Sequence, residues 1–488
     1  MVCVPGPEPR RTRITLVQAP VFSRLGPCNG LALIKAHLQA AGIPAEIRDS
    51  SMNLRRALKS RGLTWNEYLF YDSEGLLGAA EARLPGFMEE FLRDEAEEIL
   101  KTAPDIVGFS VQYPSWECCL TLARFIKQSS PQTLVVCGGP ECIRETRAFE
   151  LIRHRCVDAV ALGEADTSMA SFVRAFNPKE PFVPSVPGFL IKREGKVVDL
   201  GDAPEVKELD LLPFMDFTGF DMEAYLPDTL FIVASRGCVR KCSFCADIVH
   251  RKTYRRMSAE RILAEIRHQM RHYPDRYFVR FDDSLINGDV RLMARLSDIL
   301  APFRLERAVQ RSRQDFGWGG MAIIHPTMSP ALLGKMRRGG CQTLAYGFES
   351  ASQKVLGLMN KGFRVEDAER TIRDTKRAGI RVQVFVMVGF PGETDEDFRL
   401  TLEFLERNAG FIDIIDPSIC SILKGSHLDT HREQYGIISD SPQACSWASA
   451  DGTSTPAVRL ARFRTLMDHS RRLGFQDSDY REKVLKKP

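Results

Sequence analysis

The strongest constraint on the fold is an alternation of strand-like and amphipathic segments along the 488-residue chain. In the first third, the predicted strands are residues 13–19, 45–49, 105–111, 133–139 and 157–163. The predicted helices between and after them are residues 30–41, 87–102, 115–129 and 166–176. Apolar strands that alternate with helices are typical of a parallel sheet covered on both faces. Residues 1–176 are therefore expected to form a doubly wound, Rossmann-like α/β domain, into which residues 50–85 fit poorly and look like an insertion.

The alternation returns in the second half of the chain. The predicted strands there are residues 230–235, 277–283, 317–324, 343–350, 381–393 and 411–420. Helices are predicted between them at residues 258–273, 289–301, 329–338, 365–378 and 395–407. Six strand–helix units predict a partial (β/α)6 barrel of TIM type over residues 230–425, with its chemistry on the loops that follow the strands. Residues 177–229 are expected to be a proline-rich joint with a hairpin that turns at Glu194-Gly195, and residues 426–488 a helical C-terminal extension.

Composition narrows the class of protein. Hydrophobic residues make up 44% of the chain and charged residues 27%, which argues against long disordered segments. A net charge of +4 gives no general case for binding nucleic acid. The thirteen cysteines, with no apolar segment behind the basic N-terminal residues, indicate a cytoplasmic protein with reduced thiols. No apolar segment is long enough to predict a transmembrane helix.

The segment SRGCVRKCSFCADIVHRKTYRR (235–256) holds three closely spaced cysteines, Cys238, Cys242 and Cys245. They fall in the loop after the first strand of the predicted barrel. A structural zinc site needs four ligands, and His250 is the only nearby candidate for the fourth. A 4Fe–4S cluster on three thiolates would leave one iron open to another ligand, whereas electron-carrying clusters use four thiolates. Unligated cysteines packed in a core are disfavoured by the neighbouring arginines and lysines, so the residues alone leave the cluster and the zinc site open.

The spacing Cys-x3-Cys-x2-Cys, with Phe244 just before the last cysteine, resembles the radical S-adenosylmethionine (SAM) superfamily. The resemblance extends over about residues 230–425. It implies a 4Fe–4S cluster on Cys238, Cys242 and Cys245, SAM as the ligand of the open iron, and a flavodoxin or ferredoxin as electron donor. It also implies contacts to SAM from residues at the ends of the first, second, fourth and fifth barrel strands, namely Phe244, Asp282, Asp283, Glu349, Ser350, Gly389 and Pro391.

The first half resembles the cobalamin-binding domain that precedes the barrel in one branch of that superfamily. The segments that carry this resemblance are DIVGFSVQYP, VVCGGPEC and ALGEAD, in that order. The implied cobalamin contacts are Ser110, Val111, Gln112, Gly138, Gly139, Pro140, Gly163 and Glu164. The glycines among them would let a ligand approach the backbone closely, although tight strand–helix turns explain them equally well.

One segment departs from the cobalamin-binding pattern. Many such domains carry Asp-x-His-x-x-Gly after the first strand, where the histidine ligates cobalt, but this chain has VFSRLGPCNG (21–30). His37 lies further along the next predicted helix. Any bound cobalamin is therefore expected to have no histidine from this loop on its lower face, and a domain that kept the fold without the cofactor is the alternative.

Together the two resemblances imply a cobalamin-dependent radical SAM enzyme. The expected reaction is C-methylation of an unactivated carbon, by hydrogen abstraction with a 5′-deoxyadenosyl radical and methyl transfer from methylcobalamin. A radical SAM cyclase or oxidative rearrangement enzyme of the same architecture is the alternative, and a non-catalytic zinc protein is the third hypothesis. Small-molecule, lipid and peptide substrates all stay open, and nucleic acid is not expected. The other cysteines show no second cluster pattern, and Cys137 and Cys341 are expected to be small core residues.

Overall fold

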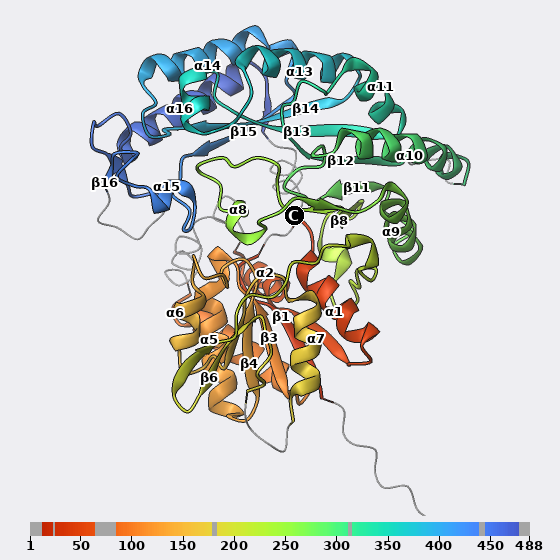
Figure 1. Ribbon diagram of the computed structural model, residues 1–488, viewed down its shortest axis with the longest axis vertical. Coiled ribbons are helices and arrows are strands. Elements are labelled where there is room, and N and C mark those ends of the chain that lie inside the picture. The colour runs from red at the N-terminus through yellow and green to blue at the C-terminus, as the bar shows by residue number, and fades with distance from the viewer. Residues whose placement is uncertain are drawn as a thin grey trace, which may run out of the picture. The chain divides into compact units, whose positions relative to one another are not determined.

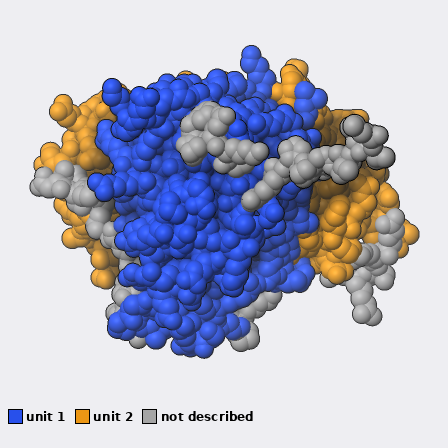
Figure 2. All heavy atoms as spheres, turned by 90° about the horizontal axis from the view of Figure 1, so that it is seen from below, with its two compact units in different colours: residues 1–207, 211–227 blue, residues 208–210, 228–488 orange. Residues whose placement is uncertain are grey.

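The computed structural model describes residues 12–22, 25–63, 84–177, 183–310, 315–438 and 445–477. The chain divides into two compact units (Figure 2). The first unit consists of residues 1–207 and 211–227, and the second of residues 208–210 and 228–488. Each unit is built around its own sheet.

The first unit contains a seven-stranded sheet with the strand order β2-β1-β3-β4-β5-β6-β7 (Figure 1). Its strands are β1 (Ile14–Gln18), β2 (Ala45–Asp49), β3 (Ile106–Ser110), β4 (Leu134–Gly138), β5 (Ala159–Ala161), β6 (Phe189–Arg193) and β7 (Lys196–Asp199). Strands β1 to β5 pair in parallel, which confirms the doubly wound sheet. The helices are α1 (Asn29–Ala40), α2 (Ser50–Ser60), α4 (Phe87–Leu100), α5 (Trp116–Ser129), α6 (Ala148–Arg153) and α7 (Ala165–Ala175). Helices α1 and α7 cover one face of the sheet and α5 and α6 the other (Figure 1).

Two expectations for this unit need correction. The hairpin of the expected joint belongs to the sheet, because β6 pairs antiparallel with β5 and extends the sheet edge. Its turn lies where expected, with positive φ at Glu194 and Gly195. Within the expected insertion, residues 50–60 form α2, which the Asp49 side chain caps by accepting from the Met52 N–H. Residues 64–83 lie outside the described part of the chain.

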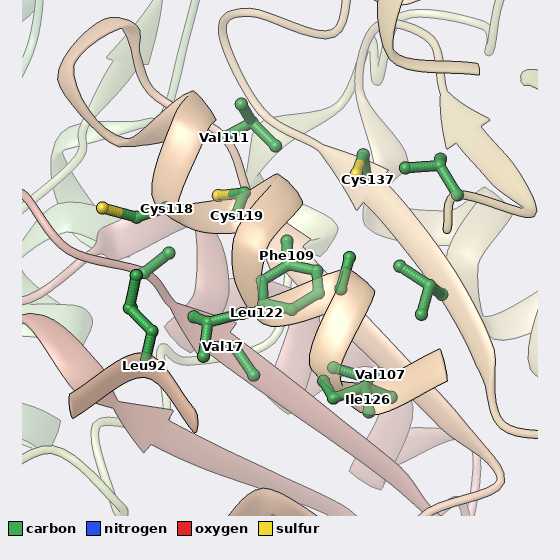
Figure 3. Close-up of a cluster of buried hydrophobic side chains, with 14 of the residues drawn as sticks. Val17, Leu92, Val107, Phe109, Val111, Cys118, Cys119, Leu122, Ile126 and Cys137 are labelled. Carbon is green, nitrogen blue, oxygen red and sulfur yellow. The ribbon is translucent and has the colours of Figure 1, made fainter. Parts of the chain in front are cut away.

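The core of the first unit lies between its sheet and the α4–α5 pair (Figure 3). Phe109 and Val107 from β3 meet Leu122 and Ile126 from α5, and all four side chains are buried. Cys137 on β4 belongs to the same core, which confirms it as a small core residue. The adjacent Cys118 and Cys119 are also buried in this core.

The second unit contains a seven-stranded sheet with the order β18-β15-β14-β13-β12-β11-β8, in which every pairing is parallel. Its strands are β8 (Thr229–Ile232), β11 (Phe278–Phe281), β12 (Gly317–Ala322), β13 (Cys341–Glu349), β14 (Arg381–Val388), β15 (Ile414–Ile419) and β18 (Gln476–Asp477). The first six confirm the predicted strand–helix units. Two short ribbons accompany them, formed by β9 (Ser235–Arg236) with β10 (Arg255–Arg256) and by β16 (Ile437–Ile438) with β17 (Ala448–Ser449).

Helices follow the strands as the alternation predicts. They are α8 (Asp247–His250), α9 (Ala259–His272), α10 (Val290–Gln310), α11 (Pro330–Arg338), α12 (Gln353–Leu358), α13 (Val365–Arg377), α14 (Asp395–Arg407), α15 (His427–Thr430) and α16 (Pro456–Arg472). The C-terminal segment is not a separate extension, since α16 packs on β14 and β15, and β18 pairs with β15. Within the described residues, no helix combines the length and apolar character needed to cross a membrane.

Candidate functional site

The three closely spaced cysteines lie on one loop at the carboxyl end of β8. The loop leaves β9 and returns through α8 to β10, and β9 and β10 pair antiparallel, so that its two ends are held together. Cys242 is buried, and Cys238 and Cys245 are half-buried. The Cys245 N–H donates to the Cys242 carbonyl over 3.1 Å. All three thiols therefore occupy one short, anchored turn at the end of the barrel where chemistry is expected.

A segment between α12 and α13 holds this loop in place. Three hydrogen bonds join the two segments: Ser243 N–H to the Met359 carbonyl (3.0 Å), Asn360 Nδ2 to the Lys241 carbonyl (2.8 Å) and Arg240 Nη1 to the Gly362 carbonyl (2.9 Å). Arg240 is thus used in a structural contact, as is Arg256, which pairs with Asp289. Two of the basic residues around the cysteines are therefore engaged in contacts within the second unit.

Lys361, in the same segment, is a site residue that sequence reasoning missed. Its ammonium lies 3.2 Å from the Glu349 carboxylate, with both side chains 9% exposed, and 5.5 Å from the centre of the Phe244 ring. Burial lowers the pKa of Lys361, but Glu349 and the Cys242 thiol outweigh it and raise the pKa above its usual value. A buried ammonium beside the cysteines can neutralise an anion bound there. The sequence offers little signal for this role, because a lysine in Asn-Lys-Gly looks like part of a surface turn.

Glu349, one of the expected SAM contacts, has a backbone conformation that is uncommon for a residue with a side chain. Its φ is +67°, at a β-bulge where the pairing of β13 with β14 shifts. Such conformations concentrate at functional sites, where surrounding structure enforces them. Here the bulge ends β13 and brings the carboxylate to Lys361.

The three thiols need a bound cation in order to ionise. Burial raises the pKa of all three, to about 12 for Cys245, so they ionise only when a bound cation compensates. In the described ranges, no group of three His, Cys, Asp or Glu side chains converges on a single metal-ion position.

The other expected SAM contacts are divided between the site and structural roles. Phe244 packs against a buried cluster that contains Met359 and Phe390, the latter from the turn Gly389–Pro391 after β14. The structure thus brings Phe244, Glu349 and this turn together around the cysteine loop. Ser350 is fully buried and its hydroxyl faces Thr401 of α14 at 3.3 Å.

The Asp283 carboxylate accepts hydrogen bonds from the backbone of the second unit. This carboxylate is fully buried and accepts from Ala234 N–H (3.1 Å), Ser235 N–H and Ser235 Oγ. It therefore fixes the chain between β8 and β9, just before the cysteine loop. Burial raises the pKa of Asp283 to about 7. Its neighbour Asp282 is exposed.

The first unit presents its expected cobalamin contacts at the carboxyl ends of β3, β4 and β5. Gly139 has φ +102°, and a Cβ there would lie 3.0 Å from both the N and the O of Val111. Ser110 Oγ would be 3.3 Å from the same Cβ. This close approach of two strand ends leaves room only for a glycine at position 139.

The remaining expected contacts in this unit lie in the same loops. Gln112 begins a 3-10 turn in which its N–H donates to Ser115 Oγ, and Gly138 accepts from Val111 N–H at 2.7 Å. Pro140 follows Gly139 and is exposed, and Gly163 precedes Glu164, whose carboxylate accepts from Val206 N–H at 3.0 Å. The Glu164 carboxylate is thus used in a hydrogen bond to the segment that follows the hairpin.

The loop after β1 is held by a buried polar network. Gln18 at the end of β1 donates to Asp49 (3.3 Å) and accepts from the Cys28 N–H (3.1 Å), and the Tyr225 hydroxyl donates to Asp49. His37 lies eight residues after the start of α1, about 12 Å further along the axis of that helix. It therefore does not replace the histidine that this loop lacks.

Comparison with known proteins agrees with this arrangement. Residues 232–405 match the model of the radical SAM superfamily. An uncharacterised methyltransferase of Pyrococcus horikoshii is 26% identical over 374 residues, which cover 76% of this chain and 77% of that protein. An anaerobic magnesium-protoporphyrin IX monomethyl ester cyclase of Rubrivivax gelatinosus is 23% identical over 317 residues, 62% of this chain and 54% of the cyclase.

Two solved structures share the fold of nearly the whole chain at 15% identity. The radical SAM methyltransferase TsrM from Kitasatospora setae, solved with cobalamin and a [4Fe-4S] cluster bound, gives a TM-score of 0.65 over 93% of this chain and 85% of its own. The cobalamin-dependent radical SAM enzyme OxsB, with aqua-cobalamin bound, gives 0.61 over 87% of this chain and 56% of its own. Residues 232–405, with three cysteines on the loop after the first barrel strand, therefore form a radical SAM domain, and the chain has the fold seen in TsrM and OxsB.

Proposed function

We propose that this protein is a cobalamin-dependent radical SAM methyltransferase that transfers a methyl group to an unactivated carbon. The observation that carries the proposal is the cysteine loop with a buried Lys361–Glu349 pair beside it, in a chain whose first unit is a doubly wound sheet and whose fold resembles that of cobalamin-bound TsrM. When bound, the cluster with SAM supplies a 5′-deoxyadenosyl radical, and methylcobalamin supplies the methyl group.

The cysteine loop would hold the cluster. Cys238, Cys242 and Cys245 provide three soft thiolate ligands, and the hydrogen bonds from Asn360 and Arg240 fix the loop that carries them. The open iron is left to the amino and carboxylate groups of SAM. Rigid placement of the loop matters because the reactive carbon has to be held close to the cluster.

Residues around the loop would bind the rest of SAM. Lys361 would attract the carboxylate of SAM, and the Glu349 carboxylate is suited to accept a hydrogen bond from its amino group. Phe244 and the turn after β14 (Gly389–Pro391) would enclose the adenosine. Asp283 acts indirectly, since it fixes the backbone that leads into the loop.

In the first unit, the ends of β3 and β4 would support cobalamin. Ser110, Val111 and the two glycines Gly138 and Gly139 form the closest approach of the strand ends. Because the loop after β1 contains no histidine, we propose that cobalamin binds without a histidine ligand from that loop. A flavodoxin or ferredoxin would supply electrons to the cluster, and the substrate is a small molecule, lipid or peptide.

The experiment is to measure iron, sulfide and cobalt in protein prepared without oxygen in the presence of cobalamin. We expect about four irons per chain from the cluster and about one cobalt from a single cobalamin bound at the sheet edge. Cys242→Ser should remove the iron and leave the cobalt, because the two sites lie in different units. Turnover should give S-adenosylhomocysteine and 5′-deoxyadenosine together, and protein without iron would refute the proposal.

The second candidate is a radical SAM cyclase without methyl transfer. The observation in its favour is the similarity to the Rubrivivax gelatinosus cyclase over 62% of this chain. Such an enzyme would form 5′-deoxyadenosine without S-adenosylhomocysteine. Product analysis during turnover therefore separates the two functions.

A further inference from the structure

The turn after β14 is held by the C-terminal segment of the chain. This turn, residues 389–393, is the part of the barrel that the proposed function places at the adenosine of SAM. One hydrogen bond closes the turn on itself: the Glu393 carboxylate accepts from the Gly389 N–H at 2.6 Å. Glu393 is only 1% exposed, so its charge needs a partner inside the protein.

Arg462 on α16 is that partner. Its Nη1 donates to Glu393 Oε2 at 3.0 Å and to the Glu393 carbonyl at 3.1 Å, and its Nη2 donates to Asp395 at 2.8 Å. The guanidinium therefore joins the last residue of the turn to the start of α14. The side chains of Arg462 and Glu393 are both buried, so solvent does not compete for the bond between them, whereas Asp395 is exposed.

Arg459, one helical turn earlier on α16, holds the other end of the turn. It is fully buried and donates to Ser454 Oγ (3.1 Å), and Ser454 Oγ donates to the Gly389 carbonyl (2.7 Å). Its guanidinium lies 4.0 Å from the centre of the Trp447 ring. Gly389 has φ +77°, and a Cβ there would collide with the Arg459 side chain. The C-terminal segment thus fits against the turn with no space left between them.

We infer that Arg462 is a positioning residue for SAM, which sets the shape of the turn at residues 389–393 through Glu393 and so determines how tightly the adenosine half of SAM binds. The inference rests on the proposed function, because it takes this turn as the adenosine site. It assigns to α16, a segment outside the match to the superfamily at residues 232–405, a role in cofactor binding.

The geometry supports positioning rather than contact with SAM. Both terminal nitrogens of Arg462 donate to Glu393 or Asp395, and the side chain is buried behind the turn, where its Nε is buried without a hydrogen-bond partner among the described residues. Arg462→Lys keeps the positive charge, but a single ammonium cannot bridge Glu393 and Asp395 as the planar guanidinium does. The shape of the turn should therefore change while the charge of the site stays the same.

The test compares SAM binding in Arg462→Lys with binding in the unaltered protein and in Arg464→Lys, an exposed arginine on the same helix. Each protein is prepared without oxygen with its cluster, and two probes are used: SAM, and methionine alone, which can chelate the open iron but has no adenosine. We expect Arg462→Lys to weaken SAM binding by about 10- to 100-fold, the effect of displacing a bound group by roughly 1 Å. Methionine binding, read from the change in the cluster's electron paramagnetic resonance spectrum, should be unchanged.

Iron content and melting temperature show whether the variant is folded. If Arg462→Lys does not fold, the milder Glu393→Gln, which keeps an acceptor for Gly389 N–H, gives the same comparison. SAM affinity within about twofold of the unaltered protein would overturn the inference, as would an equal loss of SAM and methionine binding, which indicates general damage. Failure of the unaltered protein to bind iron or SAM would instead refute the proposed function, and the inference with it.

Discussion

Replacing Lys361 by methionine tests the buried pair at the centre of the site. The Lys361 Nζ and Glu349 Oε1 atoms are 3.2 Å apart, with both side chains 9% exposed. Two unit charges at this separation attract by about 5 kcal/mol at an effective dielectric constant of about 20. Removing one partner of a buried pair costs ~3–5 kcal/mol, because the other charge stays buried without compensation. We expect Lys361→Met to lower the free energy of unfolding of the second unit by this amount.

The assay is thermal unfolding of the protein without cofactors, under reducing conditions. Fluorescence of Trp318 and Trp447 reports on the second unit, where both side chains are buried. The expected loss corresponds to a fall in melting temperature of roughly 6–20 °C for a unit of this size. The matched control is Lys335→Met, which breaks an exposed pair with Asp298 and should cost less than about 1 kcal/mol.

A double variant separates stability from function. Lys361→Met combined with Glu349→Gln removes both charges, so most of the lost stability should return. SAM affinity should stay low in the double variant, because the ammonium beside the cysteines is still missing. A single variant as stable as the unaltered protein, or a double variant no more stable than the single one, would refute this account of the pair.

Three further predictions concern the two cofactor sites and the entry to the cysteine loop. Gly139→Ala should abolish cobalt retention. In a thermal melt it should also destabilise the first unit more than the control Gly42→Ala does. Both glycines have positive φ, but only Gly139 has backbone atoms within 3.0 Å of the new Cβ. Asp283→Asn should flatten the pH dependence of unfolding. The pKa of Asp283 is about 7 in the folded chain against 3.8 in the unfolded chain, so the folded chain binds the extra proton between these values. Asp283 therefore makes the free energy of unfolding fall as pH rises from about 4 to 7, by at most about 4 kcal/mol. A variant with the same slope as the unaltered protein in denaturant titrations across that range would contradict this assignment. Cys245→Ser should remove the iron while leaving the melting temperature of the first unit unchanged, as measured by iron analysis and calorimetry.

The positions of the strands along the chain could be predicted because local sequence determines them. Near-continuous apolar segments such as residues 134–138 and 382–388 have few ways to be buried other than inside a covered parallel sheet. Strand β18 was missed for the opposite reason. It has two residues, Gln476 and Asp477, and only its pairing with β15 makes it a strand.

The site was predictable in part for the same reason. The cysteines lie within eight residues of one another, so their spacing alone carries the signal. No sequence pattern marks Lys361 or Arg462, because the role of each depends on a buried carboxylate elsewhere in the chain. Lys361 pairs with Glu349, and Arg462 pairs with Glu393. Asp283 shows the converse, since its position at a strand end suggested a ligand contact while the fold gives its carboxylate to backbone N–H groups.

The bond between Arg462 and Glu393 also has a consequence for the order of events during synthesis. The two residues are 69 positions apart. At ribosomal rates of about 5–20 residues per second, the turn after β14 emerges roughly 3–14 s before the arginine that shapes it. During that interval the nascent barrel already carries its cysteines but has an unfinished cofactor pocket. Until α16 is made, the buried carboxylate of Glu393 therefore lacks its arginine partner.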